Sequence, residues 1–241
     1  MENKKEIRGR IPNYGISLLF SFYPPQKLKT NQFFHFVLHL GFQGMAALRR
    51  KLTVVGDDRC GKTCLLFALH HQQLPQPYEP TLFDAYTADT EVDGKEMKLI
   101  LFDVAGKNEF SYRNLRSVFY RDTDVILMCF SVDRPDSQQN ILDFWVPEIK
   151  MFCPTVPIIL VATKIELRGE EGIKKKLTTP GNQPINATEG KALAASIGAY
   201  AYLECSAKTK EGVDRALEII SQCALNEKRR RKRHYRRCRI L

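Results

Sequence analysis

From Lys51 onward the chain alternates short apolar runs with amphipathic stretches, and this alternation restricts the folds that it can adopt. Continuous apolar runs are typical of strands buried on both faces, and the amphipathic stretches between them are typical of covering helices. The pattern predicts an α/β domain with a mostly parallel sheet and helices on both faces. The predicted strands are Lys51 to Gly56, Tyr86 to Val92, Lys98 to Asp103, Val125 to Ser131, Pro157 to Thr163 and Ala201 to Cys205. The predicted helices are Lys62 to His70, Ser137 to Met151, Thr188 to Ile197 and Val213 to Glu227.

The second and third predicted strands are separated by Asp93-Gly94. This dipeptide is typical of a two-residue hairpin turn, because both of its residues tolerate a positive φ. We therefore expect that pair of strands to be antiparallel, in an otherwise parallel sheet of six strands.

The net charge of +10 is concentrated at the two ends of the 241-residue chain. Residues 228–241 contain nine Lys and Arg and no acidic residue, and residues 1–44 contribute a net +4, so that residues 45–227 carry a net charge of −3. A protein that binds duplex nucleic acid needs a basic face on its folded body, and this body is mildly acidic. We therefore expect no nucleic-acid partner. The sequence predicts an N-terminal extension (1–44), disordered or an alternative start before Met45, one folded domain (45–227), and a polybasic tail (228–241).

The first predicted strand leads directly into a glycine-bearing loop that opens the first predicted helix. The loop matches the pattern G-x-x-x-x-G-K-[ST] and is followed by Cys64; its residues are Gly56, Asp57, Asp58, Arg59, Cys60, Gly61, Lys62 and Thr63. In this context successive backbone N–H groups and the helix N-terminus attract phosphates, the lysine bridges the outer phosphates and the threonine hydroxyl ligates Mg²⁺. At the end of the third strand, Asp103 can hold a magnesium-bound water and the Gly106 N–H can reach a terminal phosphate.

Five segments in sequence order make the chain similar to the Rho family of small GTPases, within the Ras superfamily. They are Gly56 to Thr63, Tyr78 to Thr81, Asp103 to Gly106, Thr163 to Arg168 and Glu204 to Thr209. The resemblance implies a P-loop small G domain that binds GTP or GDP with Mg²⁺ and hydrolyses GTP. It also implies that Gly169 to Pro184 contains the Rho-type insert helix.

The resemblance further implies roles for single residues. Thr63 and Thr81 are the expected magnesium ligands, and Thr81 also senses the γ-phosphate. Lys164 is expected to pack along the guanine base, with the Ala207 N–H meeting the guanine carbonyl. The remaining expected nucleotide-binding residues outside the loop are Leu74, Tyr78, Asp103, Gly106, Thr163, Glu166, Ser206 and Lys208.

Four positions depart from the pattern of the family. Asp58 stands where the family prefers glycine, beside the expected γ-phosphate, and its charge and bulk should obstruct a partner's arginine finger. Lys107 stands where the family has the glutamine that orients the attacking water, and an ammonium group has no acceptor with which to do so. Glu166 replaces an aspartate that accepts the guanine N–H groups, and Leu74 replaces an aromatic ring against the base. With Asp58, Lys107 and Thr81 as the catalytic positions, we expect weak GTP hydrolysis.

The chain ends in Cys238-Arg239-Ile240-Leu241, a C-a-a-X pattern whose terminal leucine favours geranylgeranylation of Cys238. The basic run before it supplies the second signal that one lipid needs for stable anchoring. We therefore expect a protein on the cytoplasmic face of the plasma membrane or of endomembranes, with a cytosolic pool. The expected partners are anionic inner-leaflet lipids, effectors that bind Tyr78 to Tyr86 and switch II (Lys107 to Tyr120), exchange factors and a dissociation inhibitor.

Three functions compete at this point. The first is a membrane-tethered GTP/GDP switch that recruits effectors and acts on the actin cytoskeleton, as the resemblance implies. The second is a nucleotide-locked scaffold that keeps the fold without cycling, which Asp58 and Lys107 would favour. The third is an ATP-using P-loop enzyme, against which the segments Thr163 to Glu166 and Ser206 to Lys208 argue.

Overall fold

The computed structural model describes residues 48–70, 83–106, 110–169 and 183–237, all within one unit of the chain, Ala46–Leu241. For residues 83, 110, 111 and 228–237 only the backbone is described. The predicted N-terminal extension, nearly all of the predicted insert and Cys238 lie outside the described residues. No helix among the described residues combines the length and the apolar character needed to span a lipid bilayer.

Six strands form one sheet in the order β2-β3-β1-β4-β5-β6, which confirms the predicted architecture. Every neighbouring pair is parallel except β2 and β3, which are antiparallel as the Asp93-Gly94 turn predicts. Both turn residues have a positive φ, 51° and 67°. The strands are β1 (Leu48–Gly56), β2 (Phe83–Val92), β3 (Lys95–Val104), β4 (Val125–Ser131), β5 (Ile158–Thr163) and β6 (Ala201–Cys205).

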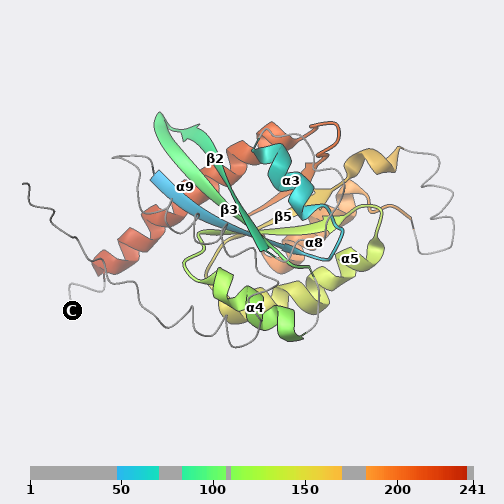
Figure 1. Ribbon diagram of the computed structural model, residues 1–241, viewed down its shortest axis with the longest axis horizontal. Helices are drawn as coiled ribbons and strands as arrows, with labels where there is room; N and C mark the ends of the chain where they lie inside the picture. The colour runs from blue at the N-terminus through green and yellow to red at the C-terminus, as the bar shows by residue number, and fades with distance from the viewer. Residues whose placement is uncertain (1–47, 71–82, 107–109, 170–182, 238–241) are drawn as a thin grey trace, which may run out of the picture. The chain divides into compact units, whose positions relative to one another are not determined.

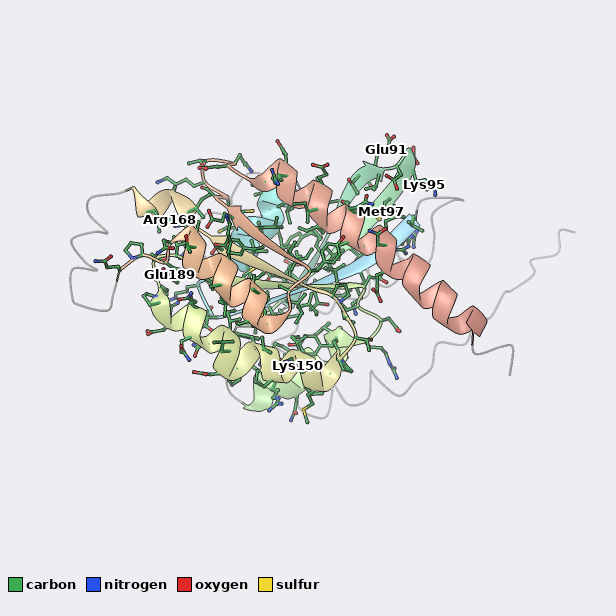
Figure 2. All side chains as sticks on the ribbon, turned by 180° about the vertical axis from the view of Figure 1, so that it is seen from behind. Glu91, Lys95, Met97, Lys150, Arg168 and Glu189 are labelled. Atoms are coloured by element: carbon green, nitrogen blue, oxygen red, sulfur yellow. The ribbon has the colours of Figure 1, made fainter. Side chains whose placement is uncertain are left out.

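Helices lie on both faces of this sheet (Figure 1), and each face carries a hydrophobic cluster. On one face lie α3 (Lys62–Leu69) and α9 (Val213–Arg237), with Leu65 and Ile220 in the cluster. On the other face lie α4 (Phe110–Tyr120), α5 (Pro135–Asn140), the π-helical turn η2 (Ile141–Trp145), α6 (Val146–Phe152) and α8 (Ala187–Ile197). Figure 2 shows Lys150 of α6 on the side of the molecule away from α9.

The residues of β4 explain how one strand serves both faces. All seven are buried, and alternate side chains enter opposite clusters: Leu127 and Cys129 join one, and Met128 and Phe130 join the other. This is the arrangement expected of a central strand in a doubly covered parallel sheet. It places the carboxyl ends of β1, β3, β4 and β5 at a single edge, where the predicted site residues follow.

The helices differ from the prediction in three places. The single helix predicted from Ser137 to Met151 is interrupted by η2, which ends two residues before Pro147. Proline has no N–H to donate to the preceding turn, and a π turn accommodates the missing bond. Helix α4 was not predicted, and α9 continues ten residues beyond the predicted end at Glu227. The apolar periodicity stops there, but Lys and Arg are good helix formers and can extend a helix that has already begun.

Candidate functional site

The P-loop, residues Gly56 to Thr63, connects β1 to α3 through two glycines with positive φ. Gly56 has a φ of 139°, and a Cβ atom there would lie 2.2 Å from the carbonyl oxygen of Cys129. Gly61 has a φ of 92° and is the residue before the first turn of α3. Glycine avoids both the clash and the strain. The loop can therefore turn sharply and place the N-terminus of α3 at the edge of the sheet.

Lys62 lies inside the loop that precedes it. Its Nζ atom donates to the carbonyl oxygens of Gly56, at 2.9 Å, and Asp57, at 2.7 Å. The residue is 7% exposed. A buried ammonium group needs such partners, because its desolvation is otherwise very costly. The lysine therefore fixes the start of the loop and carries positive charge into it.

Thr63 and Asp103 meet beside Lys62. The Thr63 hydroxyl donates to Asp103 Oδ2 at 2.5 Å. A hydroxyl and a carboxylate are hard oxygen ligands of the kind that Mg²⁺ prefers. Because they come from the P-loop and from the end of β3, they join two of the predicted motifs. This pair fits a magnesium ion bound together with phosphates, with Thr63 as its ligand and Asp103 on a bound water.

Two adjoining cavities open where these segments meet. The first has a volume of about 280 Å³ and is lined by Asp58, Arg59, Gly61, Lys62, Thr63, Cys64, Val104, Gly106 and Lys164. The second has a volume of about 170 Å³ and is lined by Gly61, Cys64, Leu65, Thr163, Lys164, Glu166, Cys205, Ala207 and Lys208. They share Gly61, Cys64 and Lys164. The basic first cavity suits phosphates, and the second lies where the predicted base-binding motifs converge.

Asp58 stands at the first cavity with its side chain 42% exposed. Its Oδ1 atom accepts a hydrogen bond from the Arg59 N–H at 3.1 Å, and the Arg59 guanidinium lies 4.0 Å from Oδ2. The Asp58 N–H donates to the Gly106 carbonyl at 3.1 Å. A Cβ atom on Gly106 would lie 2.4 Å from the Asp58 nitrogen, so glycine is needed for this contact. The start of switch II therefore lies directly against the P-loop.

Asp57 and Cys60 contribute to the site through their backbone, because their side chains point away from the cavities. Asp57 Oδ1 accepts a hydrogen bond from Trp145 Nε1 at 2.8 Å, and its Oδ2 accepts one from Asn140 Nδ2 at 2.7 Å. Cys60 Sγ lies 3.6 Å from the carbonyl oxygen of Cys129, and burial raises the pKa of this thiol. The sequence pattern did not single out Asn140 and Trp145. Their only signal was the position of a lone tryptophan in an amphipathic helix.

Thr163 and Lys164 follow β5 and brace the P-loop. The Thr163 hydroxyl contacts the carbonyl oxygen of Cys60 and lies 2.9 Å from that of Phe130. Lys164 Nζ donates to the Arg59 carbonyl at 2.9 Å and lies 3.7 Å from Asp133 Oδ1. Its stem lines both cavities, which agrees with the expected packing along a base.

Glu166 has an unusual environment for a carboxylate. Its Oε2 atom is buried, and among the described residues no donor forms a hydrogen bond with it. Such an atom normally has a partner, because leaving it without one costs free energy. Glu166 lines the second cavity. A ligand there that presents N–H donors, as the edge of guanine does, fits this atom.

An ion pair connects the segment of Glu166 to the segment of Ser206. Arg168 donates to both carboxylate oxygens of Glu204, at 2.7 and 3.0 Å, and the Tyr202 hydroxyl donates to the same group at 2.6 Å. These hydrogen bonds, chiefly that from Arg168, lower the pKa of Glu204. The Ser206 N–H donates to the Glu211 carbonyl at 3.0 Å, which fixes the next turn. The two loops of the second cavity are thus held together, and Figure 2 labels the position of Arg168.

Helix α4 is attached to this edge through a buried arginine that the sequence did not single out. Arg116 donates to both carboxylate oxygens of Glu148 on α6, at 2.8 and 2.7 Å, and to the Ala105 carbonyl at 3.1 Å. Its guanidinium lies 4.8 Å from the centre of the Trp145 ring. Trp145 therefore contacts both the P-loop and the switch II helix. The predicted site residues Lys107, Leu74, Tyr78 and Thr81 lie outside the described residues.

Comparison with known proteins identifies this arrangement. The family model described as "Ras family" matches residues 51–226. The chain is 53% identical over 184 residues to "Rho-related GTP-binding protein RhoB" of Homo sapiens, Mus musculus and Rattus norvegicus, and the match covers 76% of this chain and 93% of each relative. The chain therefore belongs to the Rho family of Ras-type small GTPases, which bind GTP and GDP with Mg²⁺ and hydrolyse GTP.

Proposed function

We propose that this protein is a GTP-dependent signalling switch at membranes that hydrolyses its nucleotide slowly and responds weakly to GTPase-activating proteins. One observation carries the proposal: the carboxylate of Asp58 lies at the phosphate cavity, beside Gly106 of switch II. The reacting bond and the Lewis acidity come with GTP and Mg²⁺. The protein's own residues bind these groups, orient them and limit what else can approach.

Charge and bulk at position 58 both oppose fast hydrolysis. The transition state of phosphoryl transfer carries negative charge on the oxygens of the γ-phosphate, and a carboxylate nearby raises its energy. Arg59 offsets this only in part, because its side chain is 74% exposed and lies 4.0 Å from the carboxylate. A side chain at this point also occupies space that an inserted arginine needs. Lys107 adds a second defect, since an ammonium group cannot accept a hydrogen bond from the attacking water.

The ends of the chain and its switch segments supply the remaining parts of the proposal. A geranylgeranyl group on Cys238 and the basic residues 228–237 together anchor the protein to anionic inner leaflets. Effectors bind Tyr78 to Tyr86 and switch II, exchange factors load GTP, and a dissociation inhibitor maintains the cytosolic pool. A role at the actin cytoskeleton follows from the family of the chain.

Single-turnover hydrolysis tests the central claim. We would compare the wild type with Asp58→Gly, Lys107→Gln and the double variant, each with and without a Rho-type GTPase-activating protein. Because both residues act on one transition state, each single reversion should recover little and the double variant much more. Wild-type stimulation equal to that of the double variant would replace this proposal with ordinary cycling.

A separate experiment tests the anchor. Cys238→Ser should release the protein from membranes, and neutralising residues 228–237 should weaken its binding and redistribute it. An unchanged membrane fraction for Cys238→Ser would contradict this part of the proposal and leave the hydrolysis part intact.

A further inference from the structure

Two basic side chains hold the P-loop, and one of them, Arg134, does not line either cavity. Arg134 Nη1 donates to the carbonyl oxygen of Asp58 at 2.8 Å, and Lys164 Nζ donates to that of Arg59 at 2.9 Å. Arg134 lies in the turn after β4, and Lys164 directly follows β5. The carbonyl groups of two consecutive P-loop residues therefore accept hydrogen bonds from cationic side chains in the segments that follow two neighbouring strands. The Rho resemblance assigns Lys164 to the base, but nothing so far gives Arg134 a role.

Because the peptide bond is planar, the hydrogen bond from Arg134 to the Asp58 carbonyl also fixes the direction of the next N–H in the P-loop. In a trans peptide the C=O and the following N–H point in opposite directions. Because Arg134 draws the Asp58 carbonyl outward, the Arg59 N–H is directed to the other side. There it donates to Asp58 Oδ1 at 3.1 Å, an anionic oxygen beside the phosphate cavity. The N–H is thus oriented as an anion donor, as a phosphate-binding loop requires.

Arg134 also has the stronger position from which to offset the charge of Asp58. Arg59 is mostly exposed and 4.0 Å from the carboxylate, so that water screens its charge. The Arg134 guanidinium is partly buried and forms a charge-assisted hydrogen bond to the same residue. Its charge acts through a less polar environment and is therefore screened less. A side chain that lies outside the cavity can still raise the electrostatic potential inside it.

We propose that Arg134 is a positioning residue that holds the P-loop in its anion-binding conformation and offsets Asp58, so that the protein retains GTP in preference to GDP. The Asp58 N–H donates a hydrogen bond to the carbonyl oxygen of Gly106, and Gly106 belongs to the motif expected at the terminal phosphate. Loss of the Arg134 charge should therefore affect the nucleotide that has a γ-phosphate most. Loss of the hydrogen bond should affect both nucleotides equally, because the loop holds their shared phosphates.

Nucleotide release tests this without hydrolysis. We would measure release of fluorescent GDP and of a fluorescent, non-hydrolysable GTP analogue from full-length protein in magnesium buffer. Arg134→Ala should accelerate release of the GTP analogue about tenfold and of GDP about threefold, the sizes expected from one charge-assisted hydrogen bond and its charge. The matched control is Arg215→Ala, which removes an exposed arginine of α9 and should leave both rates unchanged.

A second background separates charge from hydrogen bonding. In Asp58→Asn protein the carbonyl acceptor remains and the repulsive charge is absent, so Arg134→Ala should still accelerate GDP release about threefold, and the double variant should release the GTP analogue more slowly than Arg134→Ala alone. If Arg134→Ala does not fold, Arg134→Gln keeps an N–H donor and should accelerate only the GTP analogue. Equal acceleration of the two nucleotides when Asp58 is present, release of the GTP analogue from the double variant as fast as from Arg134→Ala alone, or wild-type rates in both Arg134 variants would overturn the proposal.

Discussion

The two ends of β1 both bury basic side chains, but with different consequences. At the carboxyl end, Lys62 donates to loop carbonyls beside a cavity of about 280 Å³. At the amino end, Arg50 is 5% exposed and its Nε atom donates to the Ala224 carbonyl of α9 at 2.8 Å. There Lys51 Nζ donates to the Arg121 carbonyl at 2.7 Å and lies 4.5 Å from the centre of the Phe102 ring.

The difference shows what distinguishes a binding charge from a structural one. Arg50 joins its strand to a packed helix, and Lys51 covers an aromatic ring, so both side chains contact other parts of the protein. Lys62 also has partners within the protein, yet it lines a cavity together with other polar residues, among them Arg59, Thr63 and Lys164. A polyanion can therefore share its charge. In Figure 2 the two ends of the sheet are marked by Arg168 and Glu189 on one side and by Glu91 and Lys95 on the other.

The largest expected difference between the ends is in nucleotide retention. Lys62→Ala should reduce the affinity for GTP and GDP at least about a hundredfold, because it removes both a phosphate-binding charge and two bonds within the loop. Lys51→Met, at the other end of the same strand, is the matched control and should retain both nucleotides. Equilibrium binding in magnesium buffer measures this. Comparable losses in the two variants would remove the distinction between the ends.

The next effect concerns the rigidity of the carboxyl end. Trp145→Phe removes the indole donor to the buried Asp57 carboxylate and should lower the free energy of unfolding by about 1–3 kcal/mol. Chemical denaturation of the GDP-bound protein measures the change. The neighbouring Phe144→Leu is a control, because it removes a ring that packs edge-on against Trp145 and leaves the indole N–H and the Asp57 carboxylate in place. If Trp145→Phe costs no more than Phe144→Leu, the hydrogen bond to Asp57 does not stabilise the loop.

A smaller effect is expected in the second cavity, where a substitution should change the ratio of GTP affinity to ATP affinity. Glu166→Ala should weaken GTP binding about tenfold and ATP binding much less, because guanine presents adjacent N1–H and N2–H donors to a carboxylate, whereas N1 of adenine is an acceptor. Competition between the two nucleotides gives the ratio directly. Glu211→Ala, which removes an exposed carboxylate beyond β6, serves as the control. An unchanged ratio of GTP to ATP affinity would mean that Oε2 is not the atom that recognises the base.

The smallest effect belongs to the amino end and depends on pH. Burial lowers the pKa of Lys51 from 10.5 to about 8. Between these values the unfolded chain keeps a proton that the folded protein has released, so stability rises with pH across that window. Lys51→Met should lose this rise. Thermal unfolding curves at pH values from 8 to 10.5 would compare the two proteins, and parallel curves would show that Lys51 titrates normally.

The sequence was most informative where one physical requirement determined the local structure. Strands β4 and β6 have the predicted bounds, because a fully buried central strand and a short edge strand after a helix-ending Gly198 have clear limits. The P-loop was equally clear, since only glycine satisfies the backbone at Gly56 and Gly61. The convergence of four of the five predicted motifs on two adjoining cavities follows from the parallel sheet alone. The fifth, Tyr78 to Thr81, lies outside the described residues.

What the sequence could not provide were contacts between residues far apart in the chain. Asp57 lies in the phosphate-binding loop, but its carboxylate accepts hydrogen bonds from Trp145 and Asn140, which are more than eighty positions away in the chain. In the sequence, Arg134 is an ordinary polar residue of a turn. Its partner is a backbone carbonyl, and such a hydrogen bond cannot be predicted from the pattern of side chains. Helix α4 was missed because its buried arginine interrupts the apolar periodicity, and the partner that makes this burial possible, Glu148, lies on another helix.

The π turn before Trp145 determines the rotational phase of the helix that follows it. Replacing a π turn with an α turn removes one residue from the repeat and rotates everything downstream by about 100°. Trp145 would then no longer face Asp57, and Glu148 would turn away from Arg116 in the same movement. A single deletion between Ile141 and Trp145 would thus disconnect the phosphate loop and the switch helix together, although it touches neither. The π turn therefore sets the orientations of both Trp145 and Glu148, and through them the contacts with the P-loop and with α4.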